Sequence, residues 1–107
     1  MSALNQSITP VFNIGIAIYD KKDDIIEIVI DLPEKKDKAW LHFLPQGSTM
    51  DDFIEAHLLN QVKIFTNQIV GKWQGHFIVN TKHYQKGSFI VHIDVDGLHY
   101  FSNWIKQ

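Results

Sequence analysis

The sequence predicts an α+β domain in which one long amphipathic helix packs on an antiparallel sheet of five to six strands, in the order βββ-α-βββ. Three observations predict this class. Several short segments alternate apolar and polar residues, one central segment repeats apolar residues at helical spacing, and an Asp-Gly pair separates the last two alternating segments. With 107 residues, 45% of them hydrophobic, we expect a single domain over residues 1–107 with its own core.

Three strands are predicted before the helix. Residues 12–18 and 26–32 place apolar side chains at every second position, and the polar residues 19–24 between them predict a hairpin. Residues 39–44 are predicted to form the third strand, which Pro45 ends because proline cannot donate a ladder hydrogen bond.

The helix is predicted over about residues 50–69. Thr49 is the expected N-cap, and Asp51 and Asp52 then lie in the first turn, where the helix dipole favours negative charge. Gly71 is the expected stop. The apolar stripe that faces the sheet consists of Ile54, Leu58, Val62, Phe65 and Ile69.

Three further strands are expected after the helix, at residues 73–80, 89–95 and 98–105. Asp96-Gly97 favours a two-residue type I′ turn, because both residues tolerate the positive φ angles that this turn requires. We therefore expect the last two strands to form a hairpin.

Charge is divided unevenly along the chain. Residues 1–60 hold ten acidic side chains and five lysines, a net charge of −5, whereas residues 61–107 hold two acidic side chains and five lysines, a net charge of +3. The chain has no arginine, the side chain best suited to phosphates and guanine edges, so nucleic-acid binding is disfavoured. It has no cysteine, no apolar run long enough to cross a membrane and no secretory signal, so a cytoplasmic location is expected.

The acidic residues form two clusters that have two interpretations. They serve as turn formers and helix caps, or they form a carboxylate surface that binds a basic protein partner. The candidate partner-binding residues of these clusters are Asp20, Asp23, Asp24, Glu27, Asp51, Asp52 and Glu55.

The six histidines lack the spacing of a metal site. No His-x-His or His-x-x-x-His pair occurs and no thiolate is available, so we expect no metal and no cofactor. A contact between His92 and Asp94 is compatible with the strand pattern, but no nucleophile accompanies this pair.

The predicted non-core face of the sheet carries little charge. Either a second layer of the chain covers it, or it is an interaction surface, because interface cores are rich in aromatic residues and poor in charge. Trp40, His92 and Asp94 are its candidate partner-binding residues. The full set comprises Trp40, His42, His76, Ile78, Ile90, His92, Asp94, His99, Phe101 and Asn103.

No catalytic motif occurs. Ser48, Ser88 and Ser102 lie in no Gly-x-Ser-x-Gly elbow, and the glycines are isolated rather than arranged in a phosphate-binding loop. We therefore expect a protein that is not an enzyme.

In size, class and charge pattern the whole chain resembles the immunity proteins of bacterial toxin systems such as contact-dependent growth inhibition. The resemblance implies a protein partner, a cognate toxin with nuclease activity, whose basic active-site surface the acidic side chains would cover. Residues 44–62, which begin Leu44-Pro45-Gln46-Gly47-Ser48-Thr49, are similar to the helix entry of PsbP-like and DcrB-like adaptor domains. That resemblance implies an adaptor or chaperone.

A third alternative is a small enzyme or ligand carrier that uses the His-rich face. An internal pocket formed by a curled sheet would favour this third function, and a flat exposed face without a pocket would favour the other two.

Overall fold

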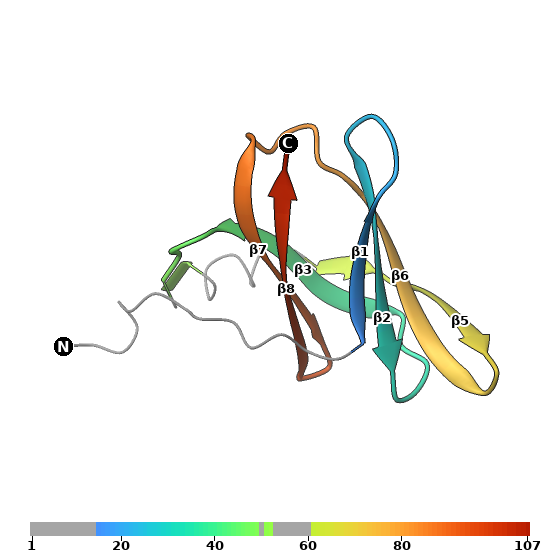
Figure 1. The fold of residues 1–107 in the computed structure, drawn as a ribbon. Helices are drawn as coiled ribbons and strands as arrows, with labels where there is room; N and C mark the ends of the chain where they lie inside the picture. The colour runs from blue at the N-terminus through green and yellow to red at the C-terminus, as the bar shows by residue number, and fades with distance from the viewer. Residues whose placement is uncertain (1–14, 50, 53–60) are drawn as a thin grey trace.

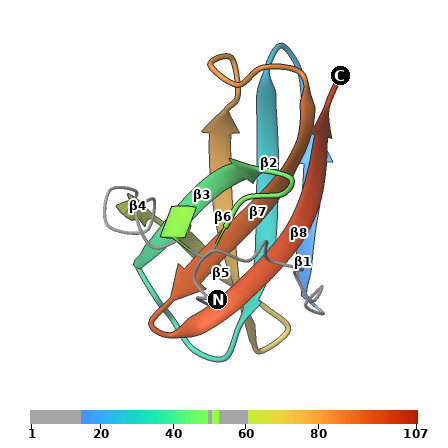
Figure 2. The same cartoon turned by 90° about the vertical axis from the view of Figure 1, so that its left-hand side faces the viewer.

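In a computed structural model the chain forms two four-stranded antiparallel sheets that pack face to face (Figures 1 and 2). The structure describes residues 15–49, 51–52 and 61–107. The first sheet has the order β1 (Ile16–Asp20), β2 (Ile25–Leu32), β6 (Lys72–Asn80), β5 (Phe65–Ile69). The second sheet has the order β4 (Gln61–Lys63), β3 (Lys38–Pro45), β7 (Gly87–Val95), β8 (Leu98–Lys106).

The predicted α+β class is wrong, because the described C-terminal part of the predicted helix forms strands. Residues 61–69 form β4 and β5, so the C-terminal half of the expected helix is extended. Val62 lies in β4, and Phe65 and Ile69 lie in β5, whereas Ile54 and Leu58 of the predicted stripe lie outside the described residues. The described residues therefore build a two-layer β structure.

The capping contacts expected between Thr49 and Asp52 are present, although the predicted long helix is wrong. The Thr49 backbone N–H donates to Asp52 Oδ2 at 2.8 Å, and the Asp52 N–H donates to Thr49 Oγ1 at 3.4 Å, which is the reciprocal pattern of a capping box. Asp51 and Asp52 have helical backbone conformation. Gly71 does not end a helix but lies in the turn between β5 and β6.

A change of sheet at Ile64 explains why the pattern of residues 61–69 resembles a helix. Residues four positions apart share a face in a strand as well as in a helix, so the spacing from Phe65 to Ile69 does not distinguish them. The step of three from Val62 to Phe65 does indicate a helix, but here Ile64 lies between two strands that pair with different partners. β4 pairs with β3, and β5 pairs with β6.

The core lies between the two sheets, and the alternation that predicted the individual strands identifies it correctly. From β2 the inward residues are Ile26, Ile28, Ile30 and Leu32, all buried. β7 contributes Phe89, Val91, Ile93 and Val95 from the opposite sheet, also buried. The chain therefore forms two sheets instead of the predicted single sheet. Their apolar inner faces cover each other, so the described core does not need a helix to cover it.

Gly75 on β6 allows close packing of Ile64, the residue at which the chain passes from one sheet to the other. A Cβ atom at this position would lie 2.9 Å from Ile64 Cγ2 and 3.1 Å from Ile30 Cγ1. Ile64 itself is buried, and its backbone N–H donates to the Asp37 carbonyl at 3.1 Å. The absence of a side chain at residue 75 therefore makes room for the residue that links the two sheets.

Tight turns with positive φ angles join the hairpins. Asp96 and Gly97 have φ angles of 53° and 87°, and Val95 pairs with Leu98, so the predicted type I′ turn and the last hairpin are confirmed. The predicted first hairpin is also confirmed, since β1 pairs with β2.

Two hydrogen bonds connect β8 to the first sheet. Trp104 Nε1–H donates to Asp20 Oδ1 at 3.2 Å, and the Tyr100 hydroxyl donates to the Asp31 carbonyl. β8 therefore lies beside β1, and Figure 2 shows both strands on the side of the molecule away from β4. No helix in the described residues is long and apolar enough to cross a membrane.

Candidate functional site: the acidic hairpin and its cavity

The acidic turn between β1 and β2 is a tight reversal built on two aspartates. Asp23 and Asp24 have φ angles of 51° and 65°, and the Ile25 N–H donates to the Lys22 carbonyl at 3.2 Å. Aspartate tolerates the left-handed region better than most residues, because its short side chain bonds locally. The local sequence therefore favours this turn and directs its charged side chains outward, where all are exposed.

Thr81, at the end of β6, holds the turn in place. Its backbone N–H and its hydroxyl both donate to the Asp24 carbonyl, at 2.7 and 3.0 Å. Thr81 is almost fully buried, so these bonds are shielded from water. The acidic turn is consequently anchored to the neighbouring strand.

Lys106 on β8 adds a second anchor. Its Nζ donates to the Thr81 and Tyr84 carbonyls at 2.6 and 2.8 Å and lies 3.4 Å from Asp24 Oδ1. The ammonium group therefore links β8, the β6–β7 connection and the acidic turn.

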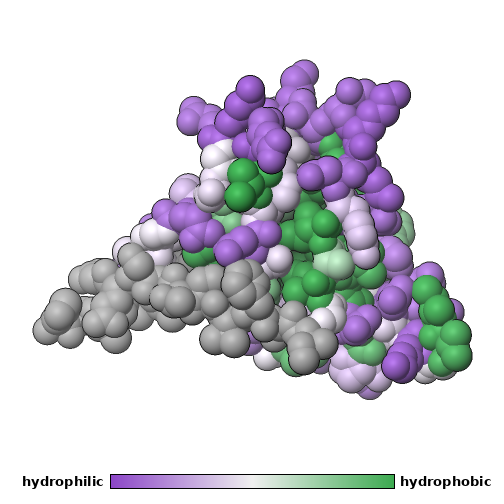
Figure 3. All heavy atoms as spheres, in the orientation of Figure 1, coloured by the Kyte–Doolittle hydropathy of each residue, from purple (hydrophilic) through white to green (hydrophobic). Residues whose placement is uncertain are grey.

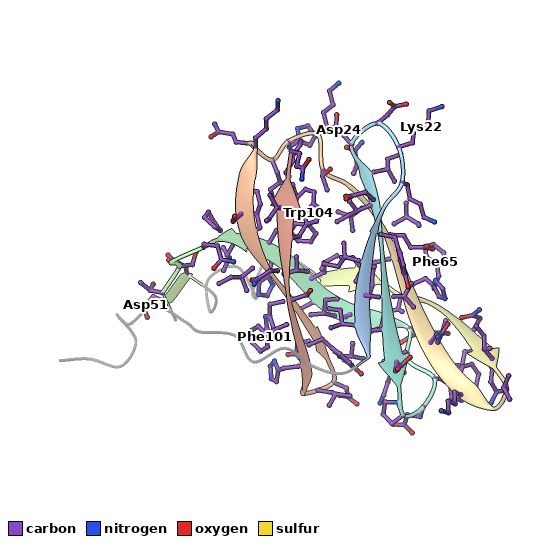
Figure 4. All side chains as sticks on the ribbon, in the orientation of Figure 1. Lys22, Asp24, Asp51, Phe65, Phe101 and Trp104 are labelled. Carbon is purple, nitrogen blue, oxygen red and sulfur yellow. The ribbon has the colours of Figure 1, made fainter. Side chains whose placement is uncertain are left out.

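A cavity of about 350 Å³ opens between this turn and the C-terminal end of β8. Residues 20–26 form one wall, and Thr81 and residues 104–107 form the other. The Trp104 indole lines the cavity and packs against Phe43 and Phe89, with ring centroids 5.6 and 5.7 Å apart. Figure 4 shows Lys22 and Asp24 on the hairpin above Trp104. We call this feature the hairpin cavity.

The charges around the hairpin cavity are partly compensated. Lys21 Nζ lies 3.2 Å from Glu27 Oε1, and Lys106 is engaged as described above. In the part of the chain that the structure describes, no ion pair or hydrogen bond engages the Asp23 side chain. Asp23 is therefore exposed at the rim, on a strongly hydrophilic end of the molecule (Figure 3).

Glu27 lies on the outer face of the first sheet rather than in the cavity. Its second oxygen is 3.5 Å from His76 Nδ1, and His76 Nε2–H donates to Asn67 Oδ1 at 3.0 Å. The hydrogen bond from Lys21 holds the pKa of Glu27 below its ordinary value of 4.5. This predicted site residue thus belongs to a surface network that spans β2, β6 and β5.

The second acidic cluster lies away from the first. Asp51 and Asp52 follow β3 and are exposed, and Figure 4 shows Asp51 well separated from Asp24. Glu55 lies outside the described residues. The structure therefore does not bring the two acidic clusters together in its described part.

The predicted non-core face is divided between the two sheets. His76 and Ile78 lie on β6, whereas the other members lie on β3, β7 and β8. Within the second group Ile90, His42, His92 and Asp94 are only 0%, 4%, 5% and 8% exposed, and Trp40 is half-buried. These four residues are therefore buried, whereas His99 and Asn103 of the same group are exposed.

A chain of three imidazoles joins the buried His42 and His92 to the exposed His99. His92 Nδ1 lies 2.8 Å from His42 Nε2, and His92 Nε2 lies 2.8 Å from His99 Nδ1. In each contact one ring donates and the other accepts, so the tautomers of the three rings are coupled. The Phe101 ring stacks on His92 with centroids 4.6 Å apart.

Asp94 stabilises the adjacent turn. Its Oδ1 accepts a hydrogen bond from the Gly97 N–H at 2.9 Å, which stabilises the Asp96-Gly97 hairpin. Among the described residues no group of three or more His, Cys, Asp or Glu side chains has the geometry to hold a metal ion.

Sequence reasoning found the aspartates of the cavity but missed its other members. Thr81 directly follows β6, and Trp104 and Lys106 both lie on β8. These two regions are far from the turn in the sequence, and each fits an ordinary strand or loop pattern. The Trp104 indole also follows the alternation of a core strand, so the sequence contains no separate signal that it lines a cavity. Comparisons with protein-family models, curated proteins and solved structures give no match for this chain.

Proposed function

We propose that this chain is a binding protein that neutralises a basic protein partner, in the manner of a toxin immunity protein, and that the acidic β1–β2 turn makes the central contact. The proposal includes the cytoplasmic location expected from the sequence. The observation that carries it is the anchored acidic turn, in which Asp24 is held by Thr81 and Asp23 is left facing outward at the rim of a cavity.

The anchoring supports binding because a preformed contact loses less conformational entropy on association. Two hydrogen bonds from Thr81 and the ammonium of Lys106 already hold the turn in the free protein. The turn therefore presents its carboxylates in one geometry.

The chemistry of the cavity fits a lysine or arginine side chain from the partner. Asp20, Asp24 and Trp104 are among the residues that line it. Carboxylates and an indole together favour a cation, through ion pairing and through the electrostatic attraction of the ring face.

The packing between the sheets favours this function over a ligand carrier. The residues that face one another there are buried aliphatic and aromatic side chains, such as Ile28, Phe77 and Ile93. The hairpin cavity instead opens at the surface, where a side chain of another protein has access.

The test compares two variants of equal charge. Asp20→Asn, Asp23→Asn and Asp24→Asn together remove three negative charges, retain side-chain shape and keep residues that tolerate the turn conformation. The control variant carries Glu34→Gln, Asp37→Asn and Asp96→Asn, which remove the same charge at exposed residues outside the candidate set. Association with the purified product of the adjacent reading frame is followed by surface plasmon resonance at low and high salt.

We expect the turn variant to associate at least about tenfold more slowly than the control at low salt, because charge complementarity acts mainly on the association rate. The difference should shrink as salt shortens the Debye length. Equal association rates for the two variants would exclude the acidic turn as the contact. Absence of binding by the wild-type protein would contradict the proposal that this gene product is its partner.

A further inference from the structure

Strand β5 is the terminal strand of the first sheet, and its edge has no features that discourage pairing. Natural edge strands are commonly protected by lysine, proline or a bulge. The strand has the sequence Phe-Thr-Asn-Gln-Ile, with no charge and no proline, and four of its five residues are exposed. Its neighbour on the inner side is β6.

The turn after β5 determines which backbone groups face outward. Val70 and Gly71 have φ angles of 49° and 79° and connect Ile69 directly to its partner Lys72, as in a two-residue type I′ hairpin. In such a hairpin the flanking pair is hydrogen-bonded, and hydrogen-bonded and non-hydrogen-bonded pairs then alternate. Ile69 and Asn67 consequently bond to β6, whereas the N–H and C=O groups of Thr66 and Gln68 point away from the sheet.

This arrangement is self-complementary about Asn67. In an antiparallel pair of two β5 strands centred there, Thr66 faces Gln68 of the other copy, and Phe65 faces Ile69. The outward backbone groups of Thr66 and Gln68 then meet in register and form four hydrogen bonds across a two-fold axis. We propose that a second copy of this chain docks on the β5 edge in this register and joins the two first sheets into one.

The side chains favour the same register. Phe65 and Ile69 are 61% and 46% exposed and lie on the same face of β5, so the pairing places an aromatic ring beside a β-branched side chain twice. Such cross-strand pairs stabilise sheets, particularly at non-hydrogen-bonded positions where side chains are closest. An uncharged strand also faces no like-charge repulsion from its own copy.

Hydrophobic surface gathers at this end of the molecule. Figure 3 shows apolar spheres at the tip of the β5–β6 hairpin, and Val70 in that turn is 97% exposed. The other outer strand of the sheet, β1, lies beside β8 and is tied to it by the Trp104–Asp20 hydrogen bond. Pairing between copies at β5 therefore leaves the hairpin cavity accessible on both.

The first measurement is molar mass against concentration by sedimentation equilibrium. We expect the mass to rise from the monomer value of 12.4 kDa toward twice that value as concentration increases. Ile69→Lys should shift the dissociation constant at least tenfold toward monomer. The matched control, Ile78→Lys, changes a similarly exposed residue on β6 away from the edge and should leave association unchanged.

The second measurement identifies the register by amide hydrogen exchange. The Thr66 and Gln68 amides should exchange rapidly at low protein concentration and slowly at high concentration, whereas the Asn67 and Ile69 amides should be protected at both. Gln68→Pro removes an outward N–H without removing a bond to β6 and should also prevent association. A constant monomer mass, or rapid exchange of Thr66 and Gln68 in a dimer, would overturn the proposal even if the proline variant failed to fold.

Discussion

At the scale of single residues, Gly75 shows how one missing side chain allows two sheets to be joined. The Ile64 and Ile30 side chains converge on the position where its Cβ would lie. Its backbone does not have the positive φ angle that requires glycine, so the need for glycine here is one of space.

Gly75→Ala should therefore lower the free energy of unfolding by about 1–3 kcal/mol, the usual cost of overpacking a filled core. Urea unfolding followed by tryptophan fluorescence measures the change. Gln74→Ala, next to it on the outer face, should change stability by less than about 0.5 kcal/mol. An equal effect of the two substitutions would show that the space above Gly75 is not tightly filled.

A second residue-scale feature is the ion pair of Lys36 with Asp96, at 2.7 Å, which Glu34 extends at 2.9 Å. The hydrogen bond with Asp96, followed by that with Glu34, raises the pKa of Lys36 to about 12. The same ammonium lowers the pKa of Asp96 below its ordinary value of 3.8. A lowered folded-state pKa contributes stability above pH 3.8, and this contribution is lost as the pH falls through the folded-state value.

Lys36→Gln should return the Asp96 pKa toward 3.8, because it removes the principal cause of the shift. Carboxyl titration by NMR measures this directly. The pKa of Glu27 depends on Lys21 and should stay low, which makes it an internal control. An unchanged Asp96 titration would assign the shift to another group.

At the scale of elements, the β5–β6 hairpin contains an unfavourable turn residue. Val70 is a β-branched residue with a φ angle of 49°, in the left-handed region that such side chains rarely occupy. Its side chain is almost fully exposed, so no packing compensates for this conformation. The strain belongs to the turn sequence itself.

Val70→Asn should raise the free energy of unfolding by about 1 kcal/mol, since Asn-Gly is the preferred type I′ pair and left-handed conformations cost other residues about 1–2 kcal/mol. Thermal and urea unfolding provide the measurement. Val70→Thr keeps β-branching and should give no such gain. If threonine stabilised the protein as much as asparagine, the effect would come from polarity at an exposed site instead of backbone strain.

At the scale of the whole molecule, hydrogen bonds between the sheets determine how β8 is held against the first sheet. Tyr100 contributes one of them through its hydroxyl, which donates to the Asp31 carbonyl. Burial, followed by the nearby Asp31 charge, raises the pKa of Tyr100 above its ordinary value of 10.0. The hydroxyl therefore remains a donor throughout the neutral range.

Tyr100→Phe should lower the free energy of unfolding by about 1 kcal/mol, the typical contribution of one such hydrogen bond. Denaturant unfolding measures the loss. Tyr19→Phe removes a hydroxyl from an exposed ring and should have an effect of less than about 0.5 kcal/mol. Similar losses from both variants would mean that the bond to Asp31 does not stabilise the packing of the sheets.

The local sequence pattern alone was sufficient to predict several structural features of this molecule. Alternation identified the inward residues of β2 and β7, and the Asp96-Gly97 pair identified the last hairpin, because both depend on neighbours in the sequence. The acidic turn and the capping contacts of Thr49 and Asp52 were predicted for the same reason. These features follow from backbone preferences and side-chain period over a few residues.

The division into two sheets and the membership of the hairpin cavity were decided by tertiary structure. The apolar spacing of residues 61–69 fits a helix as well as a strand, and the choice depends on strands β3 and β6, which bind opposite ends of this segment. Thr81 and Lys106 reach the acidic turn only because β6 and β8 end beside it. Long-range pairing overrides or completes what local periodicity favours. For that reason the sequence by itself determined six of the eight strands, the acidic turn and the last hairpin, but not β4, β5, the division into sheets or the site that they form.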